Sequence, residues 1–384
     1  MNKRNSSMES STYYQPKRPK DSTILTYLSN FIDDKFVGLL FLGVQALKAI
    51  VINEHGNSDL FVEINTENPV ARPGHVIIDV RATSVNPVDT KIRRGSEGTA
   101  GLTFPAILHI DVSGVVSSVG AGVTRFDVGD EVYGCFGGIV GIPGALADQM
   151  EADAEMLALK PKSLSFGEAA SLPLVAITAW EALIDRASIK PNDNVLVHGG
   201  TGGVGHIGIQ LAKVLGARVS TTVSTPEKAE IARRLGADEI IFYNSETPQE
   251  YSQRITEGEG FDTVFDTLGG EVLQNSLKAA KLKGHVVSII GYDRYDLTEM
   301  HFKALRLDFV FMAISIIHNE NRKHHGEILQ RLAALVDRGL VKPLIDERHD
   351  FTVAGVSAAH VRLESGNAIG KVVIERQAKL VGVA

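Results

Sequence analysis

The chain of 384 residues has one cysteine, Cys135, no excess of basic residues, and no apolar run long enough to cross a membrane. A single cysteine excludes an intrachain disulfide and a metal site built from three or four thiolates, and it favours a reducing compartment. The 39 lysine and arginine residues stand against 46 aspartate and glutamate residues, a net charge of −7, which argues against a general nucleic-acid or anionic-membrane binder. The hydrophobic fraction of 44% and the charged fraction of 22% exclude a wholly disordered chain, and the length predicts two or three domains.

The first 46 residues differ from the rest of the chain. Residues 1–23 are polar and rich in turn formers, and the apolar run 36–42 follows two aspartates and a lysine. One interpretation is a disordered, non-core extension ahead of a domain that begins at Leu47. The other is a secretory signal that is cleaved after Ala46. The aspartates beside the apolar run and the length of the segment favour the extension.

The two halves of the remaining chain have different patterns. Between Leu47 and about residue 160, short β-branched runs separated by glycine, proline and asparagine predict a β-rich unit; they lie at 48–52, 75–81, 112–119 and 131–133. From about residue 190, short apolar strands alternate with segments of helical periodicity. The expected strands are 195–198, 217–223, 239–243, 263–268 and 285–290. Such alternation predicts a parallel, doubly wound sheet.

A glycine-rich loop is the strongest chemical feature of the sequence. Gly200-x-Gly202-x-x-Gly205 follows directly after the expected strand 195–198 and opens a helix. The first glycine permits a tight turn, the second lets the backbone approach a pyrophosphate, and the third lets the helix pack on the strand. The helix N-terminus adds unpaired N–H groups and a positive dipole end. We therefore expect a dinucleotide site formed by Gly200, Gly202, Gly203, Val204 and Gly205.

The end of the following strand indicates which dinucleotide binds. A site that prefers NAD places an acidic residue there, but this chain has Thr222-Val223-Ser224-Thr225, followed by Lys228. No carboxylate is present to repel a 2′-phosphate, while hydroxyls and a lysine are present to bind it. The sequence therefore predicts NADP(H) as the cofactor, with contacts from Ser224 and Lys228.

From Leu47 to Glu375 the chain resembles the medium-chain dehydrogenase/reductase superfamily, and in particular its zinc-independent quinone oxidoreductase branch. The matching segments are SVNPVDTKIRRG (84–95), DVSGVVSSVGAGVTRFDVGDEVYG (111–134), AASLPLVAITAWEAL (169–183), HGGTGGVGHIGIQLAK (198–213), LGAD (235–238), FDTLGG (265–270) and GKVVIE (370–375).

The resemblance implies an α/β fold with two domains. A GroES-like β-rich catalytic domain would comprise residues 47–170 and a returning segment, 309–376, and a Rossmann NADP-binding domain would comprise residues 171–308. Residues 377–384 would form a tail. The resemblance also implies a cleft between the domains and a homodimer or homotetramer.

Within this superfamily the decisive question is zinc. The resemblance places Asn86, Ile110 and Leu174 at the positions of the zinc ligands, and neither apolar residue can bind a metal ion. We therefore expect no metal. An unusual site that uses His109 and Asp111 is the alternative.

The resemblance also implies the site residues. Asn86 would line the pocket where nicotinamide and substrate meet, and Thr178 would contact the nicotinamide region. Tyr133 is a candidate proton donor. Asp89 is expected to order its loop, while Arg93 and its neighbours Lys91 and Arg94 are expected to be solvated.

On the cofactor side the resemblance implies further contacts from strand ends. Tyr243 would lie beside the adenosine, and Thr267, Gly269 and Gly291 would lie near the ribose and nicotinamide. Asn367 and Lys371 would close on the cofactor from the returning segment.

Without zinc nothing stabilises an alkoxide, so the expected reaction is hydride transfer from NADPH to an electron-poor carbon. We expect a cytoplasmic oxidoreductase that acts on a quinone or an α,β-unsaturated carbonyl, without nucleic-acid or membrane partners. Two alternatives stay open: a zinc-dependent alcohol dehydrogenase, and a non-enzymatic NADPH-binding sensor or RNA- or protein-binding module.

Overall fold

The computed structural model describes residues 46–96 and 101–377. Both interpretations of the N-terminal segment concern residues 1–46, all of which except Ala46 lie outside the described residues, as does most of the expected tail. Within the part that is described, no helix is long and apolar enough to cross a membrane.

The expected β-rich unit is present. A 7-stranded sheet has the order β15-β16-β3-β5-β6-β8, with β7 also paired to β3. Its strands are β3 (His75–Val85), β5 (Asp111–Val119), β6 (Glu131–Cys135), β7 (Gln149–Asp153), β8 (Leu157–Leu159), β15 (Ile345–Asp350) and β16 (Lys371–Glu375). A smaller sheet of order β2-β1-β4 contains β1 (Leu47–Ile52), β2 (Val62–Thr66) and β4 (Ala106–Ile107).

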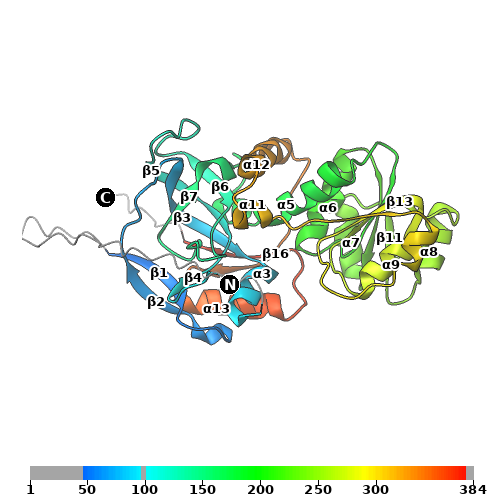
Figure 1. The fold of residues 1–384 in the computed structure, drawn as a ribbon, viewed down its shortest axis with the longest axis horizontal. Helices are drawn as coiled ribbons and strands as arrows, with labels where there is room; N and C mark the ends of the chain where they lie inside the picture. The colour runs from blue at the N-terminus through cyan, green and yellow to red at the C-terminus, as the bar shows by residue number, and fades with distance from the viewer. Residues whose placement is uncertain (1–45, 97–100, 378–384) are drawn as a thin grey trace, which may run out of the picture. The chain divides into compact units, whose positions relative to one another are not determined.

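The C-terminal segment returns to this sheet. Strand β16 pairs antiparallel with β3, with Val372 opposite Val85 and Glu375 opposite Ala82 (Figure 1, red beside blue and cyan). Helix α13 (Val353–Glu364) packs on β15 and β16. This pairing brings Lys371 next to the end of β3. The exact domain boundaries stay predictions.

The middle of the chain forms the expected doubly wound sheet. Its 6 parallel strands have the order β11-β10-β9-β12-β13-β14. They are β9 (Asn194–Val197), β10 (Arg218–Val223), β11 (Glu239–Phe242), β12 (Phe261–Asp266), β13 (Ala280–Ser288) and β14 (Arg306–Phe309). From β9 the chain adds β10 and β11 on one side of the sheet, and it then adds β12, β13 and β14 on the other side. At such a switch point, between β9 and β12, a ligand crevice opens at the carboxyl ends of the strands.

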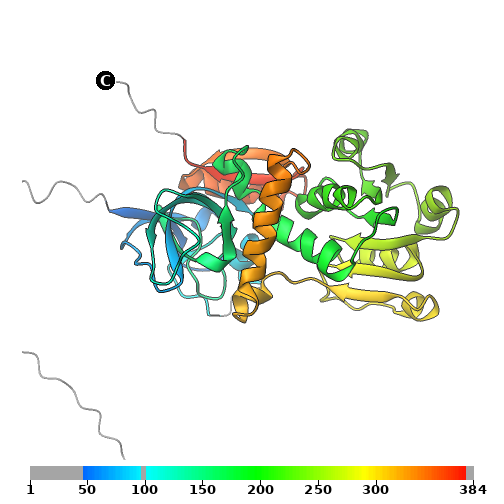
Figure 2. The ribbon, with the colours of Figure 1, turned by 90° about the horizontal axis from the view of Figure 1, so that it is seen from above.

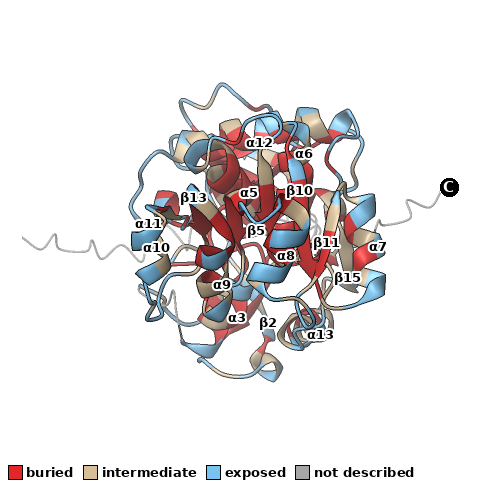
Figure 3. Ribbon diagram, turned by 90° about the vertical axis from the view of Figure 1, so that its right-hand side faces the viewer, coloured by how far each residue is buried: buried red, intermediate tan, exposed pale blue. Residues whose placement is uncertain are grey.

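Helices cover the sheets. Those of the parallel sheet are α6 (Gly203–Val214), α7 (Pro226–Arg234), α8 (Pro248–Thr256) and α9 (Glu271–Ala279). Figure 3 shows their outer faces exposed and the strands between them buried. The others are α3 (Pro87–Arg94), α4 (Phe166–Ala170), α5 (Pro173–Trp180), α10 (Thr298–Phe302), α11 (Ile314–Ile317), α12 (Arg322–Asp337), the short 3-10 turns Ser58–Leu60 and Ala154–Met156, and the π-helical turn Glu181–Arg186.

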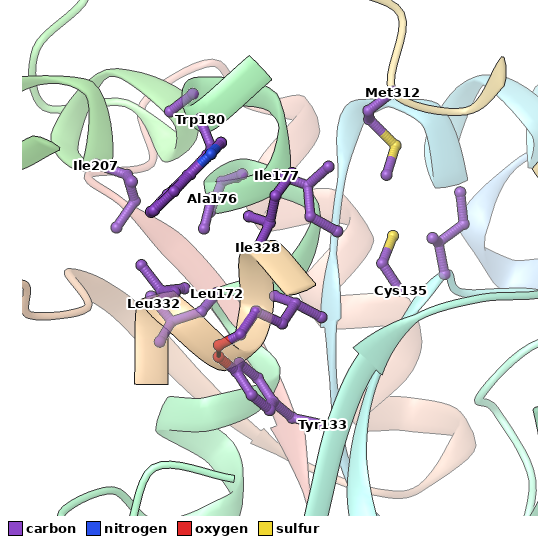
Figure 4. Close-up of a cluster of buried hydrophobic side chains, with 14 of the residues drawn as sticks. Tyr133, Cys135, Leu172, Ala176, Ile177, Trp180, Ile207, Met312, Ile328 and Leu332 are labelled. Carbon is purple, nitrogen blue, oxygen red and sulfur yellow. Dashed lines mark hydrogen bonds between the residues drawn. The ribbon is translucent and has the colours of Figure 1, made fainter. Parts of the chain in front are cut away.

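Helix α12 lies against α5 (Figure 2). A hydrophobic core joins α5, α12 and the end of β6 (Figure 4). Trp180, Leu172 and Leu332 pack together there, and Tyr133 and Cys135 extend the cluster from β6. Cys135 is fully buried, and burial raises the pKa of its thiol well above its usual value, which keeps the group protonated.

The glycine loop has the shape that its spacing predicts. Gly202 precedes α6 with φ −81° and ψ 176°, and Gly203 begins the helix. A Cβ on Gly205 would overlap the backbone carbonyl oxygen of Gly199, so only glycine lets α6 approach the end of β9 this closely.

Gly205→Ala should therefore lower the free energy of unfolding by roughly 1–3 kcal/mol, because the added methyl group forces the helix away from the strand. Gly202→Ala is the matched control in the same loop. Its added Cβ would lie 3.2 Å from the Gly199 oxygen, in backbone that any residue adopts. Urea denaturation measures both variants, and an equal loss of stability in the two would contradict this account of the loop.

Candidate active site

A cavity of about 1200 Å³ is lined both by residues at the carboxyl ends of the parallel strands and by residues of the β-rich part. Most of the residues that the sequence predicts for the site line it: Asn86, Thr178, Gly202, Gly203, Val204, Ser224, Lys228, Tyr243, Thr267 and Lys371. The structure therefore gathers residues from positions 86 to 371 around one space.

Other predicted residues lie behind the cavity wall. Gly200 and Gly205 shape the turn: a Cβ on Gly200 would overlap the Thr221 hydroxyl. Gly269 has φ 74° and donates its N–H to the Asp266 carboxylate at 3.0 Å, directly after the cavity-lining Leu268. Gly291 and Asn367 each stand between two lining residues without lining the cavity themselves.

Tyr133 lies outside the site. Its side chain is fully buried, and its hydroxyl donates to the backbone carbonyl of Leu329 in α12 at 2.6 Å (Figure 4). Burial raises the pKa of this hydroxyl well above its usual value. The proposed role of proton donor is therefore wrong on geometric grounds, because the hydroxyl is committed to the core and does not reach the cavity.

The N-terminus of α6 is suited to an anion. The N-cap residue Gly202 has no side chain that could cap this helix, and the first turn contains no acidic residue. The first backbone N–H groups and the positive dipole end therefore lie beside the cavity-lining Gly202 and Gly203 without a cap from their own segment. This is the arrangement that binds a pyrophosphate.

His198 is a lining residue that the sequence reasoning missed. Its Nδ1 lies 3.3 Å from the Thr222 hydroxyl oxygen, which accepts the Gly199 N–H at 2.9 Å. The Nε2 atom is buried and has no partner among the described residues. Burial lowers the pKa of His198 to about 4, so the ring is neutral at neutral pH. Its position directly before the glycine loop was the available signal.

At the other end of the cavity, buried polar groups converge on Asp111. The carboxylate accepts the Asn86 amide N–H at 2.8 Å, the Ser84 hydroxyl at 2.7 Å and the backbone N–H of Leu174 at 2.8 Å. The ammonium of Lys371 lies 3.4 Å from the same carboxylate. Both charged side chains are almost fully buried, so each needs the other.

Lys371 also fixes Asn86. Its ammonium donates to the Asn86 side-chain oxygen and, at 3.1 Å, to the backbone carbonyl of Val85. Because an ammonium has no acceptor, the carbonyl side of the Asn86 amide must face Lys371 and the NH₂ side must face Asp111. One of the two amide N–H groups is used by Asp111, which leaves the other as a donor with a fixed direction.

These residues do not fit a zinc ion. Ile110 and Leu174 offer no ligand atoms, and the side-chain oxygen of Asn86 already accepts from an ammonium, which is the wrong neighbour for a cation. In residues 46–96 and 101–377, no group of three or more His, Cys, Asp or Glu side chains is arranged to hold a metal.

The alternative zinc site through His109 and Asp111 fails on the same test. His109 is buried outside the cavity lining, and its two ring nitrogens face Thr83 and His360. Its φ of 74° is a left-handed conformation that costs a non-glycine residue roughly 1–2 kcal/mol.

Helix α3 contributes further groups. Asp89 is fully buried, accepts the backbone N–H of Asn86 at 2.7 Å, and so orders the turn as expected. Burial raises the pKa of its carboxyl group to about 7. Lys91 lines the cavity with its ammonium 5.2 Å from the centre of the Tyr292 ring. Arg94 is half exposed, but Arg93 is fully buried, so the expectation that it is solvated is wrong.

Thr178 lines the cavity from α5. Its hydroxyl donates to the backbone carbonyl of Leu174 at 2.8 Å, one helical turn earlier. The hydroxyl proton is therefore committed within the helix, and toward a ligand the oxygen can act only as an acceptor.

Comparison with known proteins identifies the family. The description "Alcohol dehydrogenase GroES-like domain" matches residues 72–162, and "Zinc-binding dehydrogenase" matches residues 235–374. The NADPH-dependent alkenal/one oxidoreductase, chloroplastic, of Arabidopsis thaliana is 35% identical over 337 residues, which cover 86% of this chain and 80% of that protein. The 2-methylene-furan-3-one reductase of Solanum lycopersicum is 36% identical over 336 residues, which cover 85% and 79%.

Solved structures agree. An alcohol dehydrogenase superfamily protein from Novosphingobium aromaticivorans has a TM-score of 0.81 and 38% identity, and covers 87% of this chain and 100% of its own. The quinone oxidoreductase from Coxiella burnetii has a TM-score of 0.75 and 31% identity, with the same coverage. The chain therefore belongs to the medium-chain dehydrogenase/reductase superfamily, and the expected combination of a GroES-like and a Rossmann fold is confirmed.

The buried Asp89 carboxyl generates a pH prediction. Its pKa of about 7 in the folded protein lies above the value near 4 of an unfolded aspartate, so between these pH values the folded state binds a proton that the unfolded state lacks. The contribution of the Asp89 carboxyl to the free energy of unfolding is thus fully present below about pH 4 and is lost as the pH rises to about 7.

Asp89→Asn keeps an acceptor for the Asn86 N–H and removes the ionisation. Relative to the wild type, the variant should gain stability between pH 4 and pH 7, by up to about 4 kcal/mol. Urea denaturation at a series of pH values measures the difference. A difference that does not change with pH would show that the buried carboxyl does not titrate in this range.

Proposed function

We propose that the protein is a zinc-independent, NADPH-dependent reductase that transfers hydride to a quinone or to the β-carbon of an α,β-unsaturated carbonyl. One observation carries the proposal: the dinucleotide loop lines the same cavity as Ile110 and Leu174, apolar residues that offer no zinc ligand, and the described part of the chain holds no cluster of metal-binding side chains. The names of the Arabidopsis and tomato relatives, an alkenal/one oxidoreductase and a furanone reductase, support the same chemistry.

The cofactor half of the cavity fits NADP(H). The uncapped start of α6 would hold the pyrophosphate, and the orphaned Nε2 of His198 marks a place where a ligand completes the hydrogen bonding. Ser224, Lys228 and Tyr243 line the cavity, and we infer that they face the adenosine, since a hydroxyl and an ammonium suit its 2′-phosphate. When bound, NADPH supplies the hydride.

The acceptor half combines apolar walls with hydrogen-bond donors. Ile110, Ile139, Leu174 and Met312 give it apolar walls, which suit a flat, uncharged acceptor. As negative charge develops on the acceptor oxygen, it needs donors that are already oriented. The second N–H of Asn86, whose direction Lys371 and Asp111 fix, is such a donor, and Lys91 adds positive charge to the lining.

We also propose that the protein forms a homodimer or homotetramer. Strand β14 ends the parallel sheet, and no strand of the described residues pairs with its outer edge. Large apolar side chains are exposed on and around it: Phe309 is 43% exposed and Phe302 is 78% exposed. Unpaired edges with such side chains favour association. Light scattering of the purified protein decides this, and a monomeric mass at working concentration would contradict it. The cytoplasmic location stays a prediction.

The direct test is NADPH oxidation with a panel of quinones, enals and enones, with saturated aldehydes and simple alcohols as controls. We expect turnover only with the electron-poor unsaturated acceptors. NADPH binding without oxidation by any acceptor would overturn the reductase and favour the NADPH-binding sensor. Oxidation of simple alcohols with NADP⁺ would favour the alcohol dehydrogenase.

Ser224→Asp tests the placement of the 2′-phosphate. The new carboxylate should repel the phosphate and lower the ratio of kcat/KM for NADPH to that for NADH at least about tenfold. Ser224→Asn, of similar size but neutral, is the control and should keep the preference for NADPH. Unchanged selectivity in the aspartate variant would refute the placement.

A further inference from the structure

A buried pair of histidines lies behind the acceptor half of the cavity and has no role in the function proposed above. The Nε2 atoms of His109 and His360 are 2.9 Å apart, and both rings are fully buried. His109 holds its left-handed backbone directly before Ile110 and Asp111. Strained backbone that is retained in a packed site is a reason to look for a function.

The hydrogen bonds around the pair can run in only one direction. Arg93 is a donor only, so its Nε–H donates to the His360 Nδ1 at 3.2 Å. A neutral His360 must then carry its proton on Nε2 and donate it to the His109 Nε2. His109 in turn carries its proton on Nδ1 and donates to the Thr83 hydroxyl oxygen at 3.2 Å.

This series of hydrogen bonds, from Arg93 through His360 and His109 to Thr83, ends at the active site. The Thr83 hydroxyl donates to the backbone carbonyl of Asp111 at 2.6 Å. The next residue along β3, Ser84, donates to the Asp111 carboxylate. At the other end Arg93 is anchored by the Gly56 carbonyl at 2.6 Å and by the Glu364 carboxylate.

Burial, with a smaller contribution from nearby cations, keeps both rings neutral. His360 faces Arg93 and His109, and the charge of Lys371 acts on His109. Burial and these cations lower the pKa of His109 to about 3 and that of His360 well below its usual value. Each ring therefore holds one proton, which is the condition for the one-way arrangement.

We propose that His109 and His360 are positioning residues that orient Asp111, and through it Asn86, toward the acceptor; this proposal rests on the proposed function. The hydrogen bonds from Arg93 through the two histidines to Thr83 connect four segments: β3, the turn before β5, the end of α3, and α13. These segments carry or flank Asn86, Asp111 and Lys371. The turn is closely packed, since a Cβ on Gly138 would lie 2.7 Å from the His109 backbone.

Substitutions at His360 separate positioning from folding. His360→Leu keeps the bulk but leaves the Arg93 Nε–H and the His109 Nε2 without their partner. We expect kcat/KM for the acceptor to fall roughly 10- to 100-fold, with the Kd of NADPH, measured by fluorescence titration, unchanged. His360→Gln offers both an acceptor and a donor and should restore most of the activity. Equal losses in the leucine and glutamine variants would overturn the proposal.

His109→Gly is the matched variant on the other ring, because glycine keeps the left-handed backbone without strain. If the pair acts as one unit, the double variant His109→Gly, His360→Leu should lose no more than either single variant. Losses that multiply in the double variant would mean that the two rings act separately, which contradicts the proposal.

Histidine ¹⁵N NMR of the full chain reads the tautomers without any turnover. The His109 signals, identified by their loss in the glycine variant, should show a neutral ring with its proton on Nδ1. The His360 signals, identified by their loss in the leucine variant, should show a neutral ring with its proton on Nε2, and both should be unchanged from pH 5 to pH 8. Titration of either ring in this range, or the opposite tautomers, would refute the arrangement. If no acceptor is reduced, the proposed function fails while this spectrum still decides the hydrogen-bond direction.

Discussion

The site depends on the contacts of the buried Lys371 ammonium with the Asn86 side-chain oxygen and the Asp111 carboxylate. This ammonium joins β16 to the end of β3 and to the start of β5, three segments that only the fold brings together. Neither charge is stable there alone, because a buried ion without its partner costs several kcal/mol. The requirement that both be present therefore couples the return of the C-terminal segment to the chemistry of the cavity.

This polar centre stands where the superfamily resemblance places zinc ligands, and it changes what the cavity can activate. A metal ion would polarise an alcohol or carbonyl directly. A lysine that is already saturated by Val85, Asn86 and Asp111 cannot do so, but it holds an amide N–H in one orientation. Oriented donors suffice when the acceptor carbon is electron-poor already, which is the property that quinones and enones share. In our proposal the histidine pair, which lies further from the cavity, orients Asp111 in turn, because Thr83 connects His109 to the Asp111 backbone.

Local rules predicted much of the fold. The glycine loop depends on neighbours within a few residues, and it has the expected shape. The structure shows two further local features of this kind, the Thr225 cap of α7 and the Thr247–Glu250 capping box of α8. Partners far apart in the chain could not be predicted. Tyr133 stands beside a glycine in a strand, and nothing nearby indicates that its hydroxyl meets Leu329, 196 positions later. In the sequence Arg93 resembles its solvated neighbours Lys91 and Arg94, and only the packing of α13 buries it. Strand β14 could not be predicted because its alternating charges lack the apolar pattern of a buried strand. His198 was passed over because its burial comes from the sheet and not from its own segment.

The most direct test of the central claim is the metal content of the active enzyme, measured by elemental analysis together with the rate of enone reduction before and after dialysis against a chelator. If Asn86, Lys371 and Asp111 act without a metal, the enzyme should contain far less than one zinc per chain. Its rate of enone reduction should be the same before and after dialysis. One tightly bound zinc per chain, with activity lost on its removal and restored on its return, would contradict the account.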